Sequence, residues 1–135
     1  MTVPRTGNYS LRFATQTSWT RIVLENMDAF LLDHAAAEKK ASGMAMSMVS
    51  HYPDRPQLVT AMIDLALEEL AHFKQVVKLI LQRGLVMGAD SPDLYVNQLR
   101  QLHRKGREVY LLDRLLIGSI VEARGCERFR CRRPP

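Results

Sequence analysis

The chain has 135 residues, of which 47% are hydrophobic and 24% charged, and its formal net charge is +5 at pH 7. This composition is ordinary for a globular protein, and the length suits one domain. No run of about 18 apolar residues occurs and the N-terminus lacks the apolar segment of a signal peptide, so we expect no transmembrane helix and a cytoplasmic location. Residues 128–135 hold four arginines, so most of the excess charge belongs to the tail.

A long helix is predicted from Ser18, a suitable N-cap, to about His51, because Pro53 disfavours helix at the residue before it. The residues that share one face of this helix recur in alternating steps of three and four residues. They are Leu24, Met27, Leu31, His34, Glu38, Ala41, Ala45 and Met48. Two polar residues, His34 and Glu38, therefore lie in an otherwise apolar or small stripe.

A second helix is predicted to begin at Arg55 and Pro56, since proline is tolerated in the first turn, and to end at Gly84. Its stripe again advances by four and three residues. The stripe consists of Leu58, Met62, Leu65, Glu69, His72, Val76 and Leu79. The helix therefore carries a carboxylate and an imidazole on its apolar face.

A third helix is predicted to start with Ser91 as cap and Pro92 at its first position, to break near Gly106, and to resume from Glu108 to about Phe129. One face of the resumed part consists of Leu111, Leu115, Gly118, Glu122, Gly125 and Phe129. No segment alternates with a period of two, so no strand is expected. The fold class predicted is all-α, an antiparallel helical bundle.

Acidic side chains within apolar stripes require a partner, because burying an unpaired carboxylate costs several kcal/mol. Glu38, Glu69 and Glu122 all lie on such stripes, and Glu69 and His72 form a Glu-x-x-His pair on one helical face. A metal ion is one possible partner, since four-helix di-iron proteins use glutamates and Glu-x-x-His pairs in this way. Pairing with Lys or Arg is the alternative.

The position of the turn between the first two helices tests whether these ligands can meet. Glu38 lies fifteen residues before Pro53 and Glu69 sixteen after it. Both are thus roughly 22–24 Å from the turn, at the same level of an antiparallel hairpin. His34 lies one turn from Glu38, where it is either a support for that ligand or a hydrogen-bonded core histidine.

Three segments resemble the tRNA hydroxylases that act on 2-methylthio-N6-isopentenyladenosine, a ferritin-like di-iron family. They are LLDHAAAEKKASGMAMSMVSHYPD (31–54), LALEELAHFKQV (65–76) and LLDRLLIGSIVEARGCERF (111–129). The resemblance implies a ferritin-like fold and a monooxygenase that hydroxylates the isopentenyl group. It also implies two iron ions held by Glu38, Glu69, His72 and Glu122, with no catalytic residue beyond these ligands. Dioxygen, an external electron donor or electron-transfer partner, and tRNA are the implied reactants.

The sequence departs from the family pattern in two places. Gly125 stands where the family usually has serine, and the family continues beyond Phe129 into a fourth core helix with a second Glu-x-x-His. We therefore expect residues 1–129 to form an incomplete ferritin-like domain, residues 130–135 an irregular basic tail, and this copy to be impaired by truncation. A ferritin-like iron-binding protein and a non-catalytic helical remnant remain the alternatives.

A tRNA substrate requires cations that contact phosphate. The densest internal basic group contains Arg100, Arg104, Lys105 and Arg107, with His103 among them. These residues are candidate tRNA contacts. A solvated helix face is the alternative. Near the C-terminus, Cys126 and Cys131 are expected to be thiols without a metal.

Overall fold

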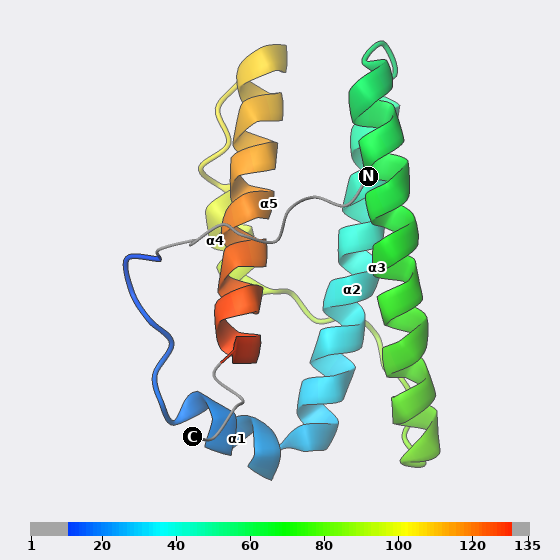
Figure 1. Ribbon diagram of the computed structural model, residues 1–135, viewed down its shortest axis with the longest axis vertical. Helices are drawn as coiled ribbons and strands as arrows, with labels where there is room; N and C mark the ends of the chain where they lie inside the picture. The colour runs from blue at the N-terminus through cyan, green and yellow to red at the C-terminus, as the bar shows by residue number, and fades with distance from the viewer. Residues whose placement is uncertain (1–10, 131–135) are drawn as a thin grey trace. The chain divides into compact units, whose positions relative to one another are not determined.

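The computed structural model describes residues 11–130, which contain five α-helices and no strand (Figure 1). The helices are α1 (Trp19–Glu25), α2 (Met27–His51), α3 (Pro56–Gln82), α4 (Leu94–Arg100) and α5 (Arg107–Arg130). The all-α prediction is therefore confirmed. None of these helices has both the length and the apolar character that crossing a bilayer requires.

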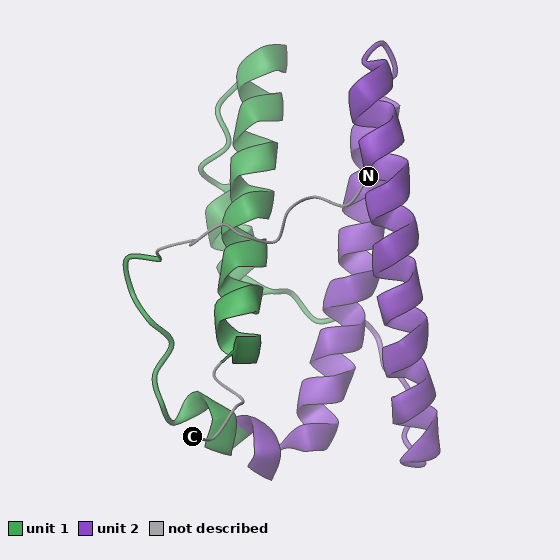
Figure 2. Ribbon diagram, viewed as in Figure 1, with its two compact units in different colours: residues 1–22, 91–135 green, residues 23–90 purple. Residues whose placement is uncertain are grey.

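The chain divides into two compact units, which are described separately (Figure 2). The hairpin unit comprises residues 23–90 and contains α2 and α3. The α5 unit comprises residues 1–22 and 91–135 and contains α4 and α5. Cys131 and the rest of the predicted tail beyond Arg130 lie outside the described part of the chain. Arg130, the first residue of the predicted irregular tail, is instead the last residue of α5.

The predicted first helix is interrupted at Asn26, where one continuous helix was expected. The Asn26 amide donates to the carbonyl oxygen of Val23 at 3.2 Å, a tight final turn that closes α1 before α2 begins at Met27. Because the helix breaks here, the face predicted from Leu24 does not continue, and Leu24 is 66% exposed. The predicted end at His51 is confirmed.

The hairpin between α2 and α3 is fixed at both ends by the residues that the sequence indicated. Pro56 lies in the first turn of α3. Gly84 adopts a φ of +73°, and the Leu85 amide donates back to the Ile80 carbonyl at 3.1 Å. This left-handed glycine ends the helix in the usual manner, because a residue with a Cβ is strained there.

The core of the hairpin unit lies between α2 and α3. Its buried members are Leu31, Ala35, Val76 and Ile80, with Met27, Leu32, Phe73, Leu85 and Met87 packed against them. The predicted stripe placed Leu79 in this core, but Leu79 is 48% exposed and Ile80 is fully buried. The reason is the period: steps that average 3.5 residues fall behind a helix of 3.6 residues per turn.

Polar contacts also support the register of α3 relative to α2 that the apolar core sets. Ser42 Oγ donates to the Ala66 carbonyl at 3.0 Å. Near the other end of the hairpin, Arg83 Nε lies 2.6 Å from Asp28 Oδ1. Together with the apolar core, these contacts prevent α3 from sliding along α2.

In the α5 unit, the N-cap and the place of Pro92 differ from those predicted for the third helix. Asp93, and not Ser91, caps α4: its carboxylate accepts from the Val96 amide at 3.0 Å. Pro92 consequently precedes the helix. Aspartate and serine are equally good caps, so the sequence did not decide between them. The predicted break at Gly106 is confirmed, and this glycine has a φ of +110°.

The buried face of α5 also differs from the predicted one. Leu111 is buried as expected, but Leu115, Glu122 and Phe129 are exposed. The residues that are buried instead are Asp113, Arg114, Ile117 and Ala123. Charged residues therefore occupy part of the covered face, which an apolar pattern does not reveal.

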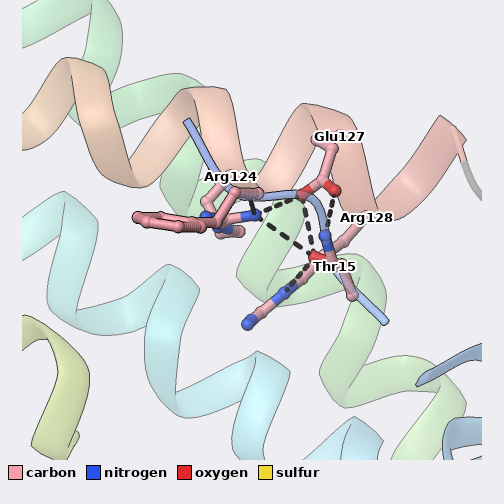
Figure 3. Close-up of polar contacts among 5 residues, drawn as sticks. Thr15, Arg124, Glu127 and Arg128 are labelled. Atoms are coloured by element: carbon pink, nitrogen blue, oxygen red, sulfur yellow. Dashed lines mark hydrogen bonds and ion pairs between the residues drawn. The ribbon is translucent and has the colours of Figure 1, made fainter. Parts of the chain in front are cut away.

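One polar network ties residues 13–15 to the end of α5 (Figure 3). Thr15 donates to Glu127 through its amide and through its hydroxyl, the latter at 2.8 Å. Arg124 Nη1 donates to Glu127 Oε2 at 2.8 Å and to the Phe13 carbonyl at 2.8 Å, and Arg128 Nε reaches the Thr15 hydroxyl at 3.5 Å. Mainly because Thr15 donates to the charged carboxylate, the pKa of Glu127 is lowered from 4.5 to about 2.

This network predicts an acid-sensitive contribution to stability. The lowered pKa means that Glu127 stabilises the fold above about pH 4.5, and that this contribution is lost as the pH falls toward 2. Urea unfolding followed by circular dichroism should therefore show Glu127→Gln less stable than wild type at pH 7, with the difference vanishing near pH 2. Asp64→Asn, which removes an exposed carboxylate from α3, should show no such difference. A constant Glu127→Gln deficit at every pH would contradict the prediction.

Candidate metal centre

Three of the four predicted ligands come together in the hairpin unit. Glu38 lies on α2, and Glu69 and His72 lie on α3. One ligand atom from each residue lies within 4.8 Å of the other two. The prediction that Glu38 and Glu69 meet at the same level is therefore confirmed, because the register of the hairpin places them opposite each other.

The two carboxylates are nearly covered, whereas the imidazole lies at the edge of the cluster. The Glu69 and Glu38 side chains are 11% and 14% exposed, and the His72 side chain is 44% exposed. His72 Nδ1 is 3.8 Å from an oxygen of each glutamate. A small ion between these atoms would have two carboxylates on its buried side and one nitrogen toward solvent.

The two carboxylates of the cluster disfavour each other's negative charge. Burial of Glu69, together with a hydrogen bond and charge repulsion from Glu38, raises its pKa from 4.5 to about 7, although His72 opposes the rise. Within residues 11–130, the ion pairs of Glu38 and Glu69 are with histidines only. The alternative of pairing with Lys or Arg is therefore not what the described part of the chain shows.

His34 makes the contact that its position suggested. Its Nε2 lies 3.2 Å from Glu38 Oε1, on the oxygen other than the one nearest His72. Its ring stacks on Phe30, with centroids 5.5 Å apart and an interplanar angle of 8°. The stacking and the carboxylate together fix the ring, and so His34 restricts how Glu38 can rotate.

The remaining predicted site residues lie in the α5 unit. Glu122 is exposed on α5 and is not a member of the three-residue cluster, so its role as a ligand stays a prediction. The predicted tRNA contacts Arg100, Arg104, Lys105 and Arg107 are all exposed around the turn between α4 and α5. Asp113, which binds Arg104, was not predicted as a functional residue; its position in the sequence close to several cations was the available signal.

A family model and two curated relatives indicate the same family. The family model described as tRNA-(MS[2]IO[6]A)-hydroxylase (MiaE) matches residues 2–134. A relative from Pseudomonas putida, named tRNA 2-(methylsulfanyl)-N(6)-isopentenyladenosine(37) hydroxylase, is 37% identical over 115 residues, which are 85% of this chain and 56% of the relative. A relative of the same name from Salmonella typhimurium is 32% identical over 102 residues, which are 76% of this chain and 37% of the relative.

A solved structure shares the fold. It is described as protein 43 with aldehyde deformylating oxygenase activity, from Synechococcus, and it matches with a TM-score of 0.83 at 37% identity. The match covers 87% of this chain and 59% of that one. The chain thus spans about half the length of the curated relatives it matches. The predicted ferritin-like fold is confirmed.

The cluster predicts opposite effects of one substitution on stability and on metal binding. Glu38→Gln removes the repulsion with Glu69, so without metal its melting temperature should rise. The same change removes a charged ligand and should weaken Mn²⁺ binding by roughly tenfold or more. Melting curves in a chelator and calorimetric titration with Mn²⁺ measure the two quantities. Asp64→Asn, which removes an exposed carboxylate of α3 that does not contribute to the raised pKa of Glu69, is the matched control and should change neither. Unaltered Mn²⁺ affinity in Glu38→Gln would refute the site.

Proposed function

The chain belongs to the MiaE family of tRNA hydroxylases, and from this premise we propose that it acts as a non-haem di-iron monooxygenase on tRNA. The substrate group is the isopentenyl side chain of 2-methylthio-N6-isopentenyladenosine. The observation that carries the proposal is the convergence of Glu38, Glu69 and His72 in a chain that matches this family along nearly its whole length.

The donor set fits iron. Carboxylate and imidazole ligands suit iron and manganese, and among residues 11–130 the ion pairs of these two close carboxylates are with histidines and not with Lys or Arg. We propose Glu38, Glu69 and His72 as ligands, with Glu122 added by its match to the family motif. Bound iron supplies the activation of dioxygen that oxidation of an unactivated C–H bond requires, with electrons from an external donor.

The protein's own residues set the geometry of that centre. Glu38 and Glu69 provide negative charge in a largely covered position, which strengthens their hold on a cation. His34 keeps Glu38 in one orientation through its contact with Oε1, as partners of ligands commonly do. The greater exposure of His72 leaves one side of the cluster accessible to reactants.

The solved relative favours a second candidate function. A chain 37% identical to this one is described as having aldehyde deformylating oxygenase activity. The same ligands could therefore serve an oxygenase whose substrate is an aldehyde. The two candidates share a metal centre and differ in substrate, so only substrate-specific products distinguish them.

Mass spectrometry of tRNA nucleosides tests the proposal directly. In a bacterial host that makes the isopentenyl nucleoside but lacks its hydroxylase, expression of the protein should yield a nucleoside one oxygen atom heavier. Glu69→Ala should abolish this product, and Glu68→Gln should retain it. An unchanged nucleoside with wild-type protein, together with consumption of an aldehyde by the iron-loaded protein, would instead support the second candidate.

The role of Glu122 has a separate test. If Glu122 is a ligand, Glu122→Ala should lower the iron bound per chain after anaerobic loading, measured by elemental analysis. Cys126→Ser is the matched control, because Cys126 is also exposed on α5 and lies one turn further along. Equal iron content in both variants would remove Glu122 from the ligand set and leave the other three in place.

A further inference from the structure

The net charge of the chain conceals two regions of opposite sign. Residues 23–90 contain six Lys and Arg against nine Asp and Glu, whereas residues 1–22 and 91–135 contain thirteen against five. Without the four arginines of the tail the second group has nine against five, so the small charge of the body outside the tail is the sum of an acidic part and a basic one. A polyanion is attracted to the α5 unit and repelled by the hairpin unit.

Within the α5 unit, the positive charge is densest around one turn. From Leu94 to Arg107 the chain contains four Lys and Arg and no Asp or Glu. Arg100 is the last residue of α4, and Arg107 is the first of α5. Arg100 and Lys105 are exposed, and neither forms an ion pair with another residue in the described part of the chain. Their charges are available to a ligand.

The turn is bound to α5 through one buried carboxylate. Asp113, which is 8% exposed, accepts three hydrogen bonds from Arg104: from the amide at 2.8 Å, from Nε at 3.1 Å and from Nη2 at 2.8 Å. These bonds lower the pKa of Asp113 to about 2, so it stays charged. Gly106, with its positive φ, lets the chain reverse directly into α5.

Aromatic contacts complete this arrangement. The ring of His103 meets that of Tyr110 edge to face, with centroids 5.0 Å apart. The Arg114 guanidinium lies over the same Tyr110 ring, 5.6 Å from its centroid. The Tyr110 ring is therefore already in contact with His103 and Arg114. The turn accordingly offers cations that can bind phosphates, and not a free aromatic ring on which bases could stack.

We propose that the turn from Arg100 to Arg107 is an RNA-backbone contact, in which Arg100 and Lys105 bind phosphates and Arg104 positions the turn. The proposal rests on the tRNA function proposed above and adds the surface that engages the nucleic acid. The proposal also gives the members of the predicted basic group different roles. Arg104 positions the turn because it already binds Asp113, whereas Arg100 and Lys105 bind the RNA. Because the turn is already ordered by these contacts, it loses less conformational entropy on binding RNA than a mobile basic loop would.

The salt dependence of RNA binding tests the proposal with the full chain. Anisotropy of a labelled, unmodified anticodon stem-loop gives the affinity at several salt concentrations. Arg100→Gln/Lys105→Gln should weaken binding and lower the slope of log affinity against log salt by about 2, roughly one for each cation removed from a phosphate. Lys74→Gln/Lys78→Gln removes the same charge from the exposed side of α3 and should leave the slope unchanged.

A second variant separates a positioned contact from simple charge attraction. Asp113→Asn makes the chain more positive by one charge, so simple attraction predicts tighter binding. Removal of the charged acceptor that fixes Arg104 predicts weaker binding instead. Circular dichroism verifies folding, and Arg104→Lys, which keeps the charge but cannot form the two-pronged pair with Asp113, should weaken binding likewise.

Equal slopes for the two double variants, or a wild-type preference for anionic lipid vesicles over RNA, would overturn the RNA contact. Neither result bears on hydroxylation, because the binding assay needs no metal or dioxygen. Conversely, RNA binding that depends on Arg100 and Lys105 without any hydroxylated nucleoside would refute the proposed reaction and keep the contact.

Discussion

The proximity of Glu38 and Glu69 inside the α2–α3 hairpin is the constraint on which the candidate site depends. Two carboxylates in a covered position repel each other, and separating them would relieve the repulsion. The hairpin does not permit this, because the core around Ala35 and Ile80 lies on one side and the bond from Ser42 to Ala66 on the other. The fold therefore maintains a local electrostatic cost that a cation would convert into binding energy.

Two other carboxylates of the same chain, one buried and one partly buried, show that such a cost is avoidable. Asp113 and Glu127 are each bound by an arginine and by a backbone amide, and their pKa values are lowered to about 2. Glu69 has no arginine, and its pKa is raised to about 7. The chain has fourteen arginines with which to neutralise Glu69 if it served structure alone. The contrast within one molecule is what distinguishes the candidate site from the structural ion pairs.

The sequence predicted those features that depend on local chemistry or on repeating periods. Helix type, the turn at Pro53, the stop at Gly84 and the meeting of Glu38 with Glu69 all follow from residues near one another or from counting along a helix. The predictions were wrong or incomplete where the burial or role of a residue depends on a partner elsewhere in the chain. The apolar pattern of α5 did not reveal that Asp113 is covered, because its partner Arg104 lies across a turn. Thr15 likewise gains its role only from Glu127, more than one hundred residues away.

Segregation of charge along the chain resolves a conflict that the proposed function creates. An enzyme that binds metal through carboxylates and RNA through cations contains groups that would neutralise one another if interspersed. Here residues 23–90 have an excess of acids, and the remaining segments have an excess of bases. Where the basic segments do contain covered carboxylates, these are used to fix arginines such as Arg104 and Arg124 in place. Cations such as Arg100 and Lys105 are thereby left for phosphate, and the carboxylates at Glu38 and Glu69 are left for metal.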